Sequence, residues 1–199
     1  TPFLLVTSIR NFLYNIGVIK SHQFNIPIIS IGNLDLGGSG KTPSIEYLVR
    51  LLSNNYKVAV LSRGYGRKSI GFILADYNSD AGTIGDESMQ YYKKFKNIIV
   101  SVDSNRVRGI NKLIKLNSKL EIVLLDDAYQ HRKVKPGMSI LLTKFNDLYS
   151  DDNIFPLGNL RESKRNANRA DIIIVTKCNS DINEDQKKQV IQKLNISDN

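Results

Sequence analysis

Seven short apolar runs, separated by helical patterns, constrain this chain more than any other feature of its sequence. Most of the runs lack polar alternation, so they suit strands that are buried on both faces of a parallel sheet. The alternation of strands and helices predicts an α/β layered fold with a mainly parallel sheet flanked by helices, which binds ligands at the carboxyl ends of its strands. The runs are Pro27–Ile31, Lys57–Ser62, Phe72–Ala75, Asn97–Val102, Glu121–Leu125, Met138–Thr143 and Asp171–Thr176.

Apolar side chains between these runs recur at helical spacing, and we interpret each stripe as core packing rather than as a cofactor surface. Ser104 is a candidate cap for the third stripe. The stripes are Ile45, Leu48, Val49 and Leu52, then Met89, Tyr92 and Phe95, then Val107, Ile110, Leu113 and Ile114.

A glycine-rich segment, Gly37-Gly38-Ser39-Gly40-Lys41-Thr42, joins the first predicted strand to the first predicted helix. That context is what a P-loop needs, because backbone N–H groups wrap around phosphate and the helix adds its positive end. In a P-loop NTPase-like fold, Lys41 would reach the β- and γ-phosphates of a nucleotide and Thr42 would bind Mg²⁺. Asp35 stands where the strict pattern has glycine, so an ordinary glycine-rich turn stays open as the alternative.

Two adjacent acids, Asp126 and Asp127, end the apolar run that begins near Leu120. An apolar strand that ends in an acid is the shape of a Walker B segment, whose carboxylate holds Mg²⁺ directly or through water. Acids also cap many strands, so the interpretation depends on the P-loop. The sequence does not say which of the two acids contacts the metal.

Two polar clusters follow or precede predicted elements near the same edge of the sheet. Arg63 and Tyr65 lie in a Gly-rich basic segment after the second run, which suits planar recognition of phosphate or an ordinary basic turn. Asp86, between Gly85 and Glu87, opens a helical stripe, so it is either a general base for a hydroxyl group or a helix cap.

Further candidates lie after the two acids and near the end of the chain. Gln130 and His131 follow the acids within a few residues, and the imidazole would either organise the site or serve the core. Arg161, next to Glu162, would neutralise a transferred or substrate phosphate.

The composition limits the class of protein. A chain of 199 residues with 41% hydrophobic residues suits one domain or one large lobe, and we expect it to be a piece of a longer protein. The single cysteine, Cys178, excludes an internal disulfide. The net charge of +9 favours an anionic partner or a solvated basic surface. We do not expect nucleic acid, because no basic motif interleaved with aromatic residues is present.

The first 24 residues are rich in apolar side chains, with Arg10 and Lys20 as their only charges. They predict an amphipathic helix that lies on an anionic membrane or a helix packed on the core of the domain itself. A signal peptide is not expected, because no small-residue cleavage site follows. The apolar residues are Phe3, Leu4, Leu5, Val6, Ile9, Phe12, Leu13, Ile16, Val18 and Ile19.

Taken together, these motifs resemble the tetraacyldisaccharide 4'-kinase family, over roughly residues 10 to 178. The most specific parts are the L-D-D-x-x-Q-H run and the P-loop, since the family also lacks glycine at the position of Asp35. The chain differs at Ala128, where the family has glycine. The matching segments are Ser30–Leu34, Gly37–Pro43, Leu61–Gly66, Gly85–Glu87, Asp103 with Arg106-Val107, Leu125–Arg132 and Pro156–Glu162.

The resemblance implies transfer of the γ-phosphoryl group of ATP, with Mg²⁺, to the 4'-hydroxyl of a tetraacyldisaccharide 1-phosphate, which gives lipid IVA in lipid A biosynthesis. Asp86 would be the catalytic base, and Lys41 and Thr42 would hold phosphate and Mg²⁺. Asp126 and Asp127 would be the Walker B acids. The remaining carried-over residues would line the nucleotide or lipid headgroup site; they are Arg63, Tyr65, Arg106, Gln130, His131, Arg161 and Glu162.

The resemblance also implies an organisation for the whole protein. Residues 1–24 would form a helix that associates with the cytoplasmic face of the bacterial inner membrane, and residues 25–199 would form the P-loop kinase lobe. The lipid substrate and the membrane surface would be its partners, with no stable protein partner. The family has a second lobe with a histidine that pairs with the catalytic aspartate, and no residue here matches it, so we expect little turnover from this chain alone.

Other functions remain open from the residues alone. A P-loop transferase or ATPase acting on a soluble substrate would not need the apolar N-terminal segment. A P-loop nucleotide switch would carry an N-K-x-D segment that reads guanine, and Thr176-Lys177-Cys178-Asn179 occupies that place without its first Asn and its Asp. A nucleic-acid binder would lose affinity steeply with salt.

Overall fold

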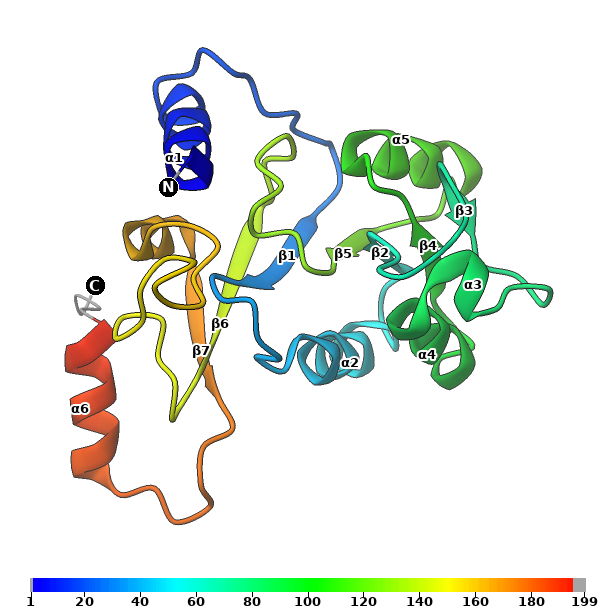
Figure 1. The fold of residues 1–199 in the computed structure, drawn as a ribbon. Helices are drawn as coiled ribbons and strands as arrows, with labels where there is room; N and C mark the ends of the chain where they lie inside the picture. Colours follow the sequence, from blue (N-terminus) through cyan, green and yellow to red (C-terminus); the bar gives the residue numbers. More distant parts are fainter. Residues whose placement is uncertain (1, 195–199) are drawn as a thin grey trace.

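A seven-stranded sheet forms the centre of the molecule (Figure 1). The computed structural model describes residues 2–194, with side chains from Val6 onward. The strand order is β3-β4-β2-β5-β1-β6-β7, and every pairing is parallel except that of β3 with β4. The strands are β1 (Ile28–Asn33), β2 (Val58–Ser62), β3 (Ile73–Leu74), β4 (Ile99–Val102), β5 (Ile122–Leu125), β6 (Met138–Lys144) and β7 (Ile172–Thr176).

Each of the seven predicted apolar runs forms a strand, with ends shifted by no more than two residues. The predicted α/β layered fold with a mainly parallel sheet is therefore confirmed. The physical reason is visible in β2, whose five residues are all buried, as expected for a central strand covered on both faces.

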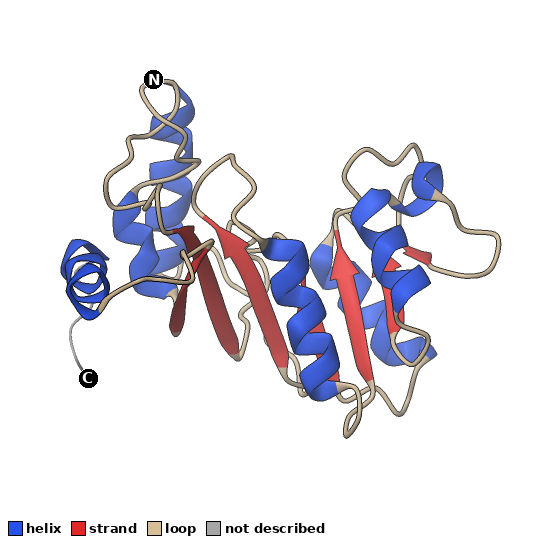
Figure 2. Ribbon diagram, turned by 90° about the horizontal axis from the view of Figure 1, so that it is seen from below, coloured by secondary structure: helices blue, strands red, loops and turns tan. Residues whose placement is uncertain are grey.

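Helices lie on both faces of the twisted sheet (Figure 2). The three predicted stripes fall in α2, α4 and α5, whereas the short α3 and the 3-10 helix η1 were not predicted. Asn105, not Ser104, caps α5, because its side chain accepts a hydrogen bond from the Arg108 amide at 3.1 Å. The helices are α1 (Pro2–Asn15), α2 (Lys41–Leu52), α3 (Ala81–Ile84), α4 (Asp86–Lys94), α5 (Arg106–Leu116), η1 (Lys164–Arg169) and α6 (Glu184–Leu194).

Alternate residues of the central strands point into two separate apolar clusters. Val58 and Val60 of β2 pack with α2 and α4, while Ala59 and Leu61 pack with α5 on the opposite face. A third cluster joins η1 and α6 to β6 and β7. The sheet is therefore the middle layer of three.

The pairing of β1 with β5 brings the glycine-rich loop and the two adjacent acids to the same edge of the sheet. β1 pairs with β5 on one side and with β6 on the other, and Ser30 lies opposite Leu125. Because parallel strands end at the same edge, the loop after β1 and the acids after β5 are neighbours.

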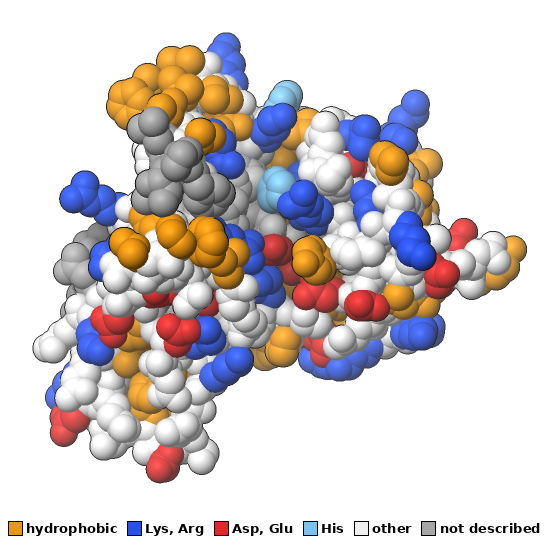
Figure 3. Space-filling view, in the orientation of Figure 1, with side chains coloured by type: hydrophobic (Ala, Val, Ile, Leu, Met, Phe, Trp, Pro, Cys, Tyr) orange, Lys and Arg blue, Asp and Glu red, His pale blue; other side chains and the backbone are white. Residues whose placement is uncertain are grey.

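Several apolar side chains are exposed among the described residues of α1 and at Ile16, directly after it. Val6, Ile9, Phe12 and Ile16 are 65, 49, 59 and 54% exposed, and hydrophobic side chains gather over this helix in Figure 3. Its described side chains, from Val6 onward, are absent from the three core clusters. The side chains of Phe3, Leu4 and Leu5 lie outside the described residues.

The segment after α1 returns to the body of the molecule. His22 forms a parallel bridge with Val134, and Phe24 packs against the α5 cluster. The apolar stretch expected as one unit over residues 1–24 thus consists of a helix that ends at Asn15 and a connector fastened to the sheet. Within residues 2–194, no helix is both long enough and apolar enough to span a bilayer.

Candidate functional site

The loop after β1 has the backbone that phosphate binding requires. Gly40 ends the loop with φ 85°, in the left-handed region that favours glycine, and no side chain caps the helix α2 that follows. The amide groups of the first turn of α2 therefore remain available for an anion. Ser39 is fully buried, and its hydroxyl has no hydrogen-bond partner among the described residues.

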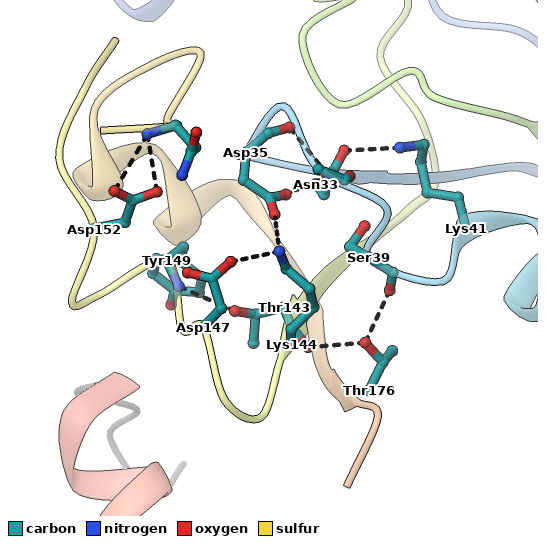
Figure 4. A network of polar contacts seen from close by, with 12 residues as sticks. Asn33, Asp35, Ser39, Lys41, Thr143, Lys144, Asp147, Tyr149, Asp152 and Thr176 are labelled. Carbon is teal, nitrogen blue, oxygen red and sulfur yellow. Dashed lines mark hydrogen bonds and ion pairs between the residues drawn. The ribbon is translucent and has the colours of Figure 1, made fainter. Parts of the chain in front are cut away.

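Side chains hold this loop from two sides (Figure 4). The Asn33 side-chain amide donates to the carbonyl oxygens of Asp35 and Gly37, both at 3.1 Å, and to the Asp35 carboxylate. Lys144 of β6 forms an ion pair with the Asp35 carboxylate at 3.4 Å and another with Asp147. The strict P-loop pattern has glycine at the position of Asp35. The aspartate is accommodated there because its carboxylate pairs with the Asn33 side-chain amide and with Lys144.

The end of β7 is also tied to the loop. The Thr176 hydroxyl donates to the Ser39 carbonyl at 2.8 Å, as Figure 4 shows. The next residue, Lys177, has φ 56°, a left-handed conformation that turns the chain away from the sheet.

Lys41 is held between the loop and the acids. Its Nζ donates to the Asn33 Oδ1 at 3.2 Å and lies 3.6 Å from the Asp127 Oδ1. Arg161 donates to both carboxylate oxygens of Asp127, at 3.3 and 3.2 Å. Two predicted cations therefore meet one predicted acid at the carboxyl edge of the sheet.

The two acids have opposite environments. Asp126 is buried, and burial, followed by the nearby charge of Glu87, raises the pKa of its carboxyl to about 7. Burial also opposes ionisation of Asp127, but Lys41 and Arg161 outweigh it and hold the pKa of Asp127 below its usual range. Without a bound cation, Asp127 is the charged member of the pair near neutral pH.

Tyr91 of α4 links two predicted metal ligands. Its hydroxyl donates to the Asp126 Oδ2 at 3.0 Å and is hydrogen-bonded to the Thr42 side chain. The other oxygen of Asp126, Oδ1, is buried without a hydrogen-bond partner among the described residues. Burial raises the pKa of the Tyr91 hydroxyl, so it stays protonated and acts as a donor.

These groups line an open cleft of about 610 Å³. Gly85, with φ 83°, brings the start of α4 against the far wall, since a side chain there would meet the Tyr65 carbonyl at 2.7 Å. The Tyr65 ring is 87% exposed. The cleft is lined by Leu36, Gly37, Gly38, Lys41, Ser62, Arg63, Gly64, Tyr65, Glu87, Asp126, Asp127 and Arg161.

An apolar cavity of about 440 Å³ lies on the other side of the P-loop. Gly40 and Ser44 form its floor next to the phosphate site, and the exposed ring of Tyr47 lines it together with Ile174 and Lys177. A flat, apolar group attached to a phosphate in the loop would find a surface of suitable chemistry there.

Comparison with known proteins identifies the family. The model of the tetraacyldisaccharide-1-P 4'-kinase family matches residues 1–198. The chain belongs to this family. A tetraacyldisaccharide 4'-kinase of Flavobacterium johnsoniae is 56% identical over 193 residues, and one of Bacteroides thetaiotaomicron is 50% identical over 192 residues.

A solved member of the tetraacyldisaccharide 4'-kinase family has the same fold. The crystal structure of LpxK from Aquifex aeolicus in complex with ATP superposes with a TM-score of 0.81 at 36% identity, over 88% of this chain and 56% of that one. The two bacterial relatives are matched over 97 and 96% of this chain but over 57 and 50% of their own lengths. The chain thus spans about half the length of the curated relatives it matches.

Several residues that the kinase resemblance suggested as substrate contacts lie outside the cleft. Arg106 is 2% exposed and donates to the carbonyl oxygens of Asp103 and Asp126, at 2.6 and 3.2 Å. Gln130 donates to the Asn33 carbonyl at 2.7 Å. Both side chains hold the backbone behind the site and, in this structure, do not face an open surface of the cleft.

His131 and Glu162 also depart from the expected place. Burial lowers the pKa of His131 to about 4, so its imidazole is neutral near neutral pH, and it lines a neighbouring cavity that the phosphate cleft does not include. Glu162 is 1% exposed, with its carboxylate turned toward α1. The surroundings of these two side chains have no signature in the sequence, because both residues lie in irregular segments.

Asp86 and Glu87, the two acids in the first turn of α4, differ in their position relative to the cleft. Glu87 lines the cleft, whereas Asp86, the expected base, is exposed and lies outside the lining residues. Sequence reasoning did not single out Glu87, Tyr91, Asn33 or Lys144. Asn33 and Glu87 stood in segments that matched the family, so the sequence signalled these two, whereas it gave no signal for Tyr91 or Lys144.

Proposed function

We propose that the chain is the nucleotide-binding lobe of a kinase that transfers the γ-phosphoryl group of ATP to the 4'-hydroxyl of a tetraacyldisaccharide 1-phosphate, giving lipid IVA. The carrying observation is the meeting of Lys41, Arg161 and Asp127 in a cleft beside a loop with P-loop geometry. Membership of the tetraacyldisaccharide-1-P 4'-kinase family supports this lipid acceptor over a soluble one.

Phosphate groups of the nucleotide would bind the Gly37–Gly40 backbone and the first turn of α2. The unpaired Ser39 hydroxyl supports this assignment, since a buried hydroxyl without a protein partner can take one from a bound phosphate. Lys41 and Arg161 would exchange their contacts with Asp127 for the transferred phosphate, whose charge is spread over its oxygens in the transition state.

Thr42 and Asp126 fit a magnesium ion. The buried and unpaired Asp126 Oδ1 is a hard oxygen donor, and Tyr91 keeps the Thr42 hydroxyl next to it. No three His, Cys, Asp or Glu residues within the described range cluster as a metal site by themselves, in keeping with Mg²⁺ bound partly through phosphate oxygens. The ion would neutralise developing charge on the phosphates.

Asp86 would act as the general base. As the acceptor oxygen forms its bond to phosphorus, the proton of the 4'-hydroxyl would pass to the Asp86 carboxylate and the bond to the leaving ADP would break. The place of Asp86 at the first residue of α4, beside the cleft-lining Glu87, supports an approach from that wall. Arg63 and Tyr65 would contact the nucleotide or the lipid headgroup.

The apolar cavity beside Gly40 would hold the nucleoside. Asn179 stands where a guanine-reading segment has an aspartate, which supports adenine and weighs against a guanine-nucleotide switch. The related Aquifex protein was crystallised in complex with ATP, which supports the same nucleotide here.

The N-terminal segment, residues 1–24, would associate with the membrane, with residues 25–199 as the kinase lobe. The exposed row Val6, Ile9, Phe12 and Ile16 supports insertion of α1 at the level of the lipid headgroups. The protein would then sit peripherally on the cytoplasmic face of the inner membrane, where its lipid substrate and ATP meet.

The test is an assay of the full-length protein with labelled ATP, Mg²⁺ and tetraacyldisaccharide 1-phosphate in detergent, beside its Lys41→Ala variant. Lipid phosphorylation that disappears in the variant is the expected result. ATP hydrolysis without a phosphorylated lipid would overturn the proposal and favour a transferase with a soluble acceptor.

A further inference from the structure

Among the described side chains of helix α1, from Val6 onward, polar groups supply the buried contact with the body of the molecule. Among residues 6–15, Asn11 is the one buried side chain, at 4% exposure. Its Nδ2 donates to the Glu162 Oε2 at 2.8 Å, and its carbonyl accepts from the Arg132 Nη1 at 2.7 Å. The Arg132 guanidinium also stacks on Tyr14, 5.0 Å from the ring centre.

Glu162 receives three donors in a place without solvent. Besides Asn11, the Asn166 Nδ2 donates to Oε2 at 2.8 Å and the Arg169 Nη2 donates to Oε1 at 2.7 Å. A carboxylate that is 1% exposed is costly unless it is paired in this way. The buried carboxylate therefore fixes the position of Asn11 through a directional hydrogen bond. An apolar contact of the same area has no preferred direction and would fix the position less well.

Arg161, the residue before Glu162, contacts the phosphate site. Arg161 donates its amide to the Leu34 carbonyl at 2.7 Å and its guanidinium to Asp127. One short segment therefore carries Arg161 on the side of the P-loop and Glu162 on the side of α1. Leu160, buried before them, bridges to Asp35 and anchors the segment in the loop itself.

We propose that Glu162 is a positioning residue that seats α1 at a fixed place relative to Arg161, so that the membrane-facing helix and the phosphate site move as one unit. The inference rests on the proposed function as an interfacial lipid kinase. An acceptor whose acyl chains stay in a bilayer can present its hydroxyl only at a fixed height above the surface. The bridge from Asn11 through Glu162 to Arg161 sets that height.

Paired substitutions in the full-length protein test the bridge. Asn11→Asp sets a carboxylate against Glu162. Adding Glu162→Gln gives that carboxylate an N–H donor, leaves the amide oxygen to accept from Arg169, and needs only that the Asn166 amide turn over to accept the second N–H. Asn15→Asp is the matched control, because Asn15 is exposed on the same helix. Spin labels on Cys178 and on a cysteine introduced by Phe12→Cys, both exposed sites, report the distance from α1 to the end of β7 once other cysteines are replaced by serine.

We expect a narrow distance distribution that Asn11→Asp broadens, that the double variant narrows again and that the control leaves unchanged. This measurement needs no catalysis, so it can fail or succeed independently of the kinase assignment. An unchanged distribution in Asn11→Asp would overturn the seating by Glu162.

The kinetic test separates positioning from general damage to the fold. With substrate in mixed phospholipid vesicles, Asn11→Asp should raise the KM for lipid about tenfold, which corresponds to about 1.4 kcal/mol, a usual cost for a disrupted buried hydrogen bond. The KM for ATP should stay within about twofold, and the double variant should recover most of the loss. Equal losses for both substrates, or no recovery, would contradict the proposal.

Discussion

At the scale of the residue, the environments of Asp126 and Asp127 predict opposite changes in stability when each aspartate is replaced by asparagine. For Asp126 the folded pKa of about 7 lies above the ordinary value of about 4, so the folded protein keeps a proton that the unfolded chain has lost. Stability conferred by that proton is complete below about pH 4 and is lost as the pH rises toward 7. Asp127 behaves in the reverse sense, because its pKa is lowered in the folded state.

We therefore expect Asp126→Asn to raise the free energy of unfolding at pH 8, by up to about 4 kcal/mol, and to change it little near pH 4. Asp127→Asn should lower it at pH 8, because Lys41 and Arg161 lose their partner. Denaturant unfolding at both pH values, without nucleotide or Mg²⁺, measures both effects. A loss of stability at pH 8 in Asp126→Asn would mean that the ionised carboxylate stabilises the folded protein, which contradicts a raised pKa.

The choice of base is a second prediction at this scale. If Asp86 takes the proton of the hydroxyl, Asp86→Asn in the full-length enzyme should lower kcat by about 10²–10⁴-fold and leave the KM for ATP nearly unchanged. Glu87→Gln, one residue along the same turn, is the matched variant and should retain most of the activity. The reverse ranking would transfer the role to Glu87, which is the acid that lines the cleft.

At the scale of the element, the junction of α3 with α4 depends on one glycine. Gly85 has φ 83° and ψ 158°, and a Cβ would lie 2.7 Å from the Tyr65 carbonyl. Gly85→Ala should lower the stability by about 1–3 kcal/mol and shift the start of α4. Gly82→Ala is the control, since its Cβ would meet the Asp80 side chain at an ordinary 3.4 Å. Thermal unfolding of both variants checks this, and equal effects would contradict it.

The elements also show where sequence reasoning ends. Continuous apolar runs such as Lys57–Ser62 were predicted as strands because a strand buried on both faces of a parallel sheet shows no polar alternation, and this run contains the observed strand Val58–Ser62. In α4 the stripe Met89, Tyr92 and Phe95 was predicted to pack on the core, and Tyr92 and Phe95 do so while partly buried, but the fully buried residues are Ser88 and Tyr91. Nine residues hold too few turns to fix the helical phase, so the polar contact of Tyr91 with Asp126 was missed.

The site also contains residues that the sequence predicted and residues whose surroundings it did not predict. Lys41, Thr42 and the two acids were predicted because they follow strands, and the parallel register brings strand ends together. Glu162 and His131 lie in irregular segments, where partners come from residues far away in the sequence, as with Asn11 and Glu162. No local pattern specifies such partners, so the surroundings of Glu162 and His131 required the structure.

At the scale of the whole molecule, the two sides of the cleft differ in how well their side chains are held. The P-loop, the acids and Arg161 form a connected network, whereas Tyr65 on the opposite side is 87% exposed. Relatives at about twice this length have further chain to contribute. A phosphate held on one side only keeps much of its water, and electrostatic stabilisation of the transition state weakens where water remains.

Residues 1–199 alone should therefore bind ATP with Mg²⁺ weakly, with a thermal stabilisation that grows logarithmically with nucleotide and that Lys41→Ala removes. Their lipid phosphorylation should be lower than that of the full-length protein by about 10³-fold, the range lost when a general base and its surroundings are incomplete. The measurement compares both proteins at equal concentration with the same lipid in detergent. Turnover by the 199-residue chain within about tenfold of the full-length rate would mean that this lobe contains the whole catalytic apparatus.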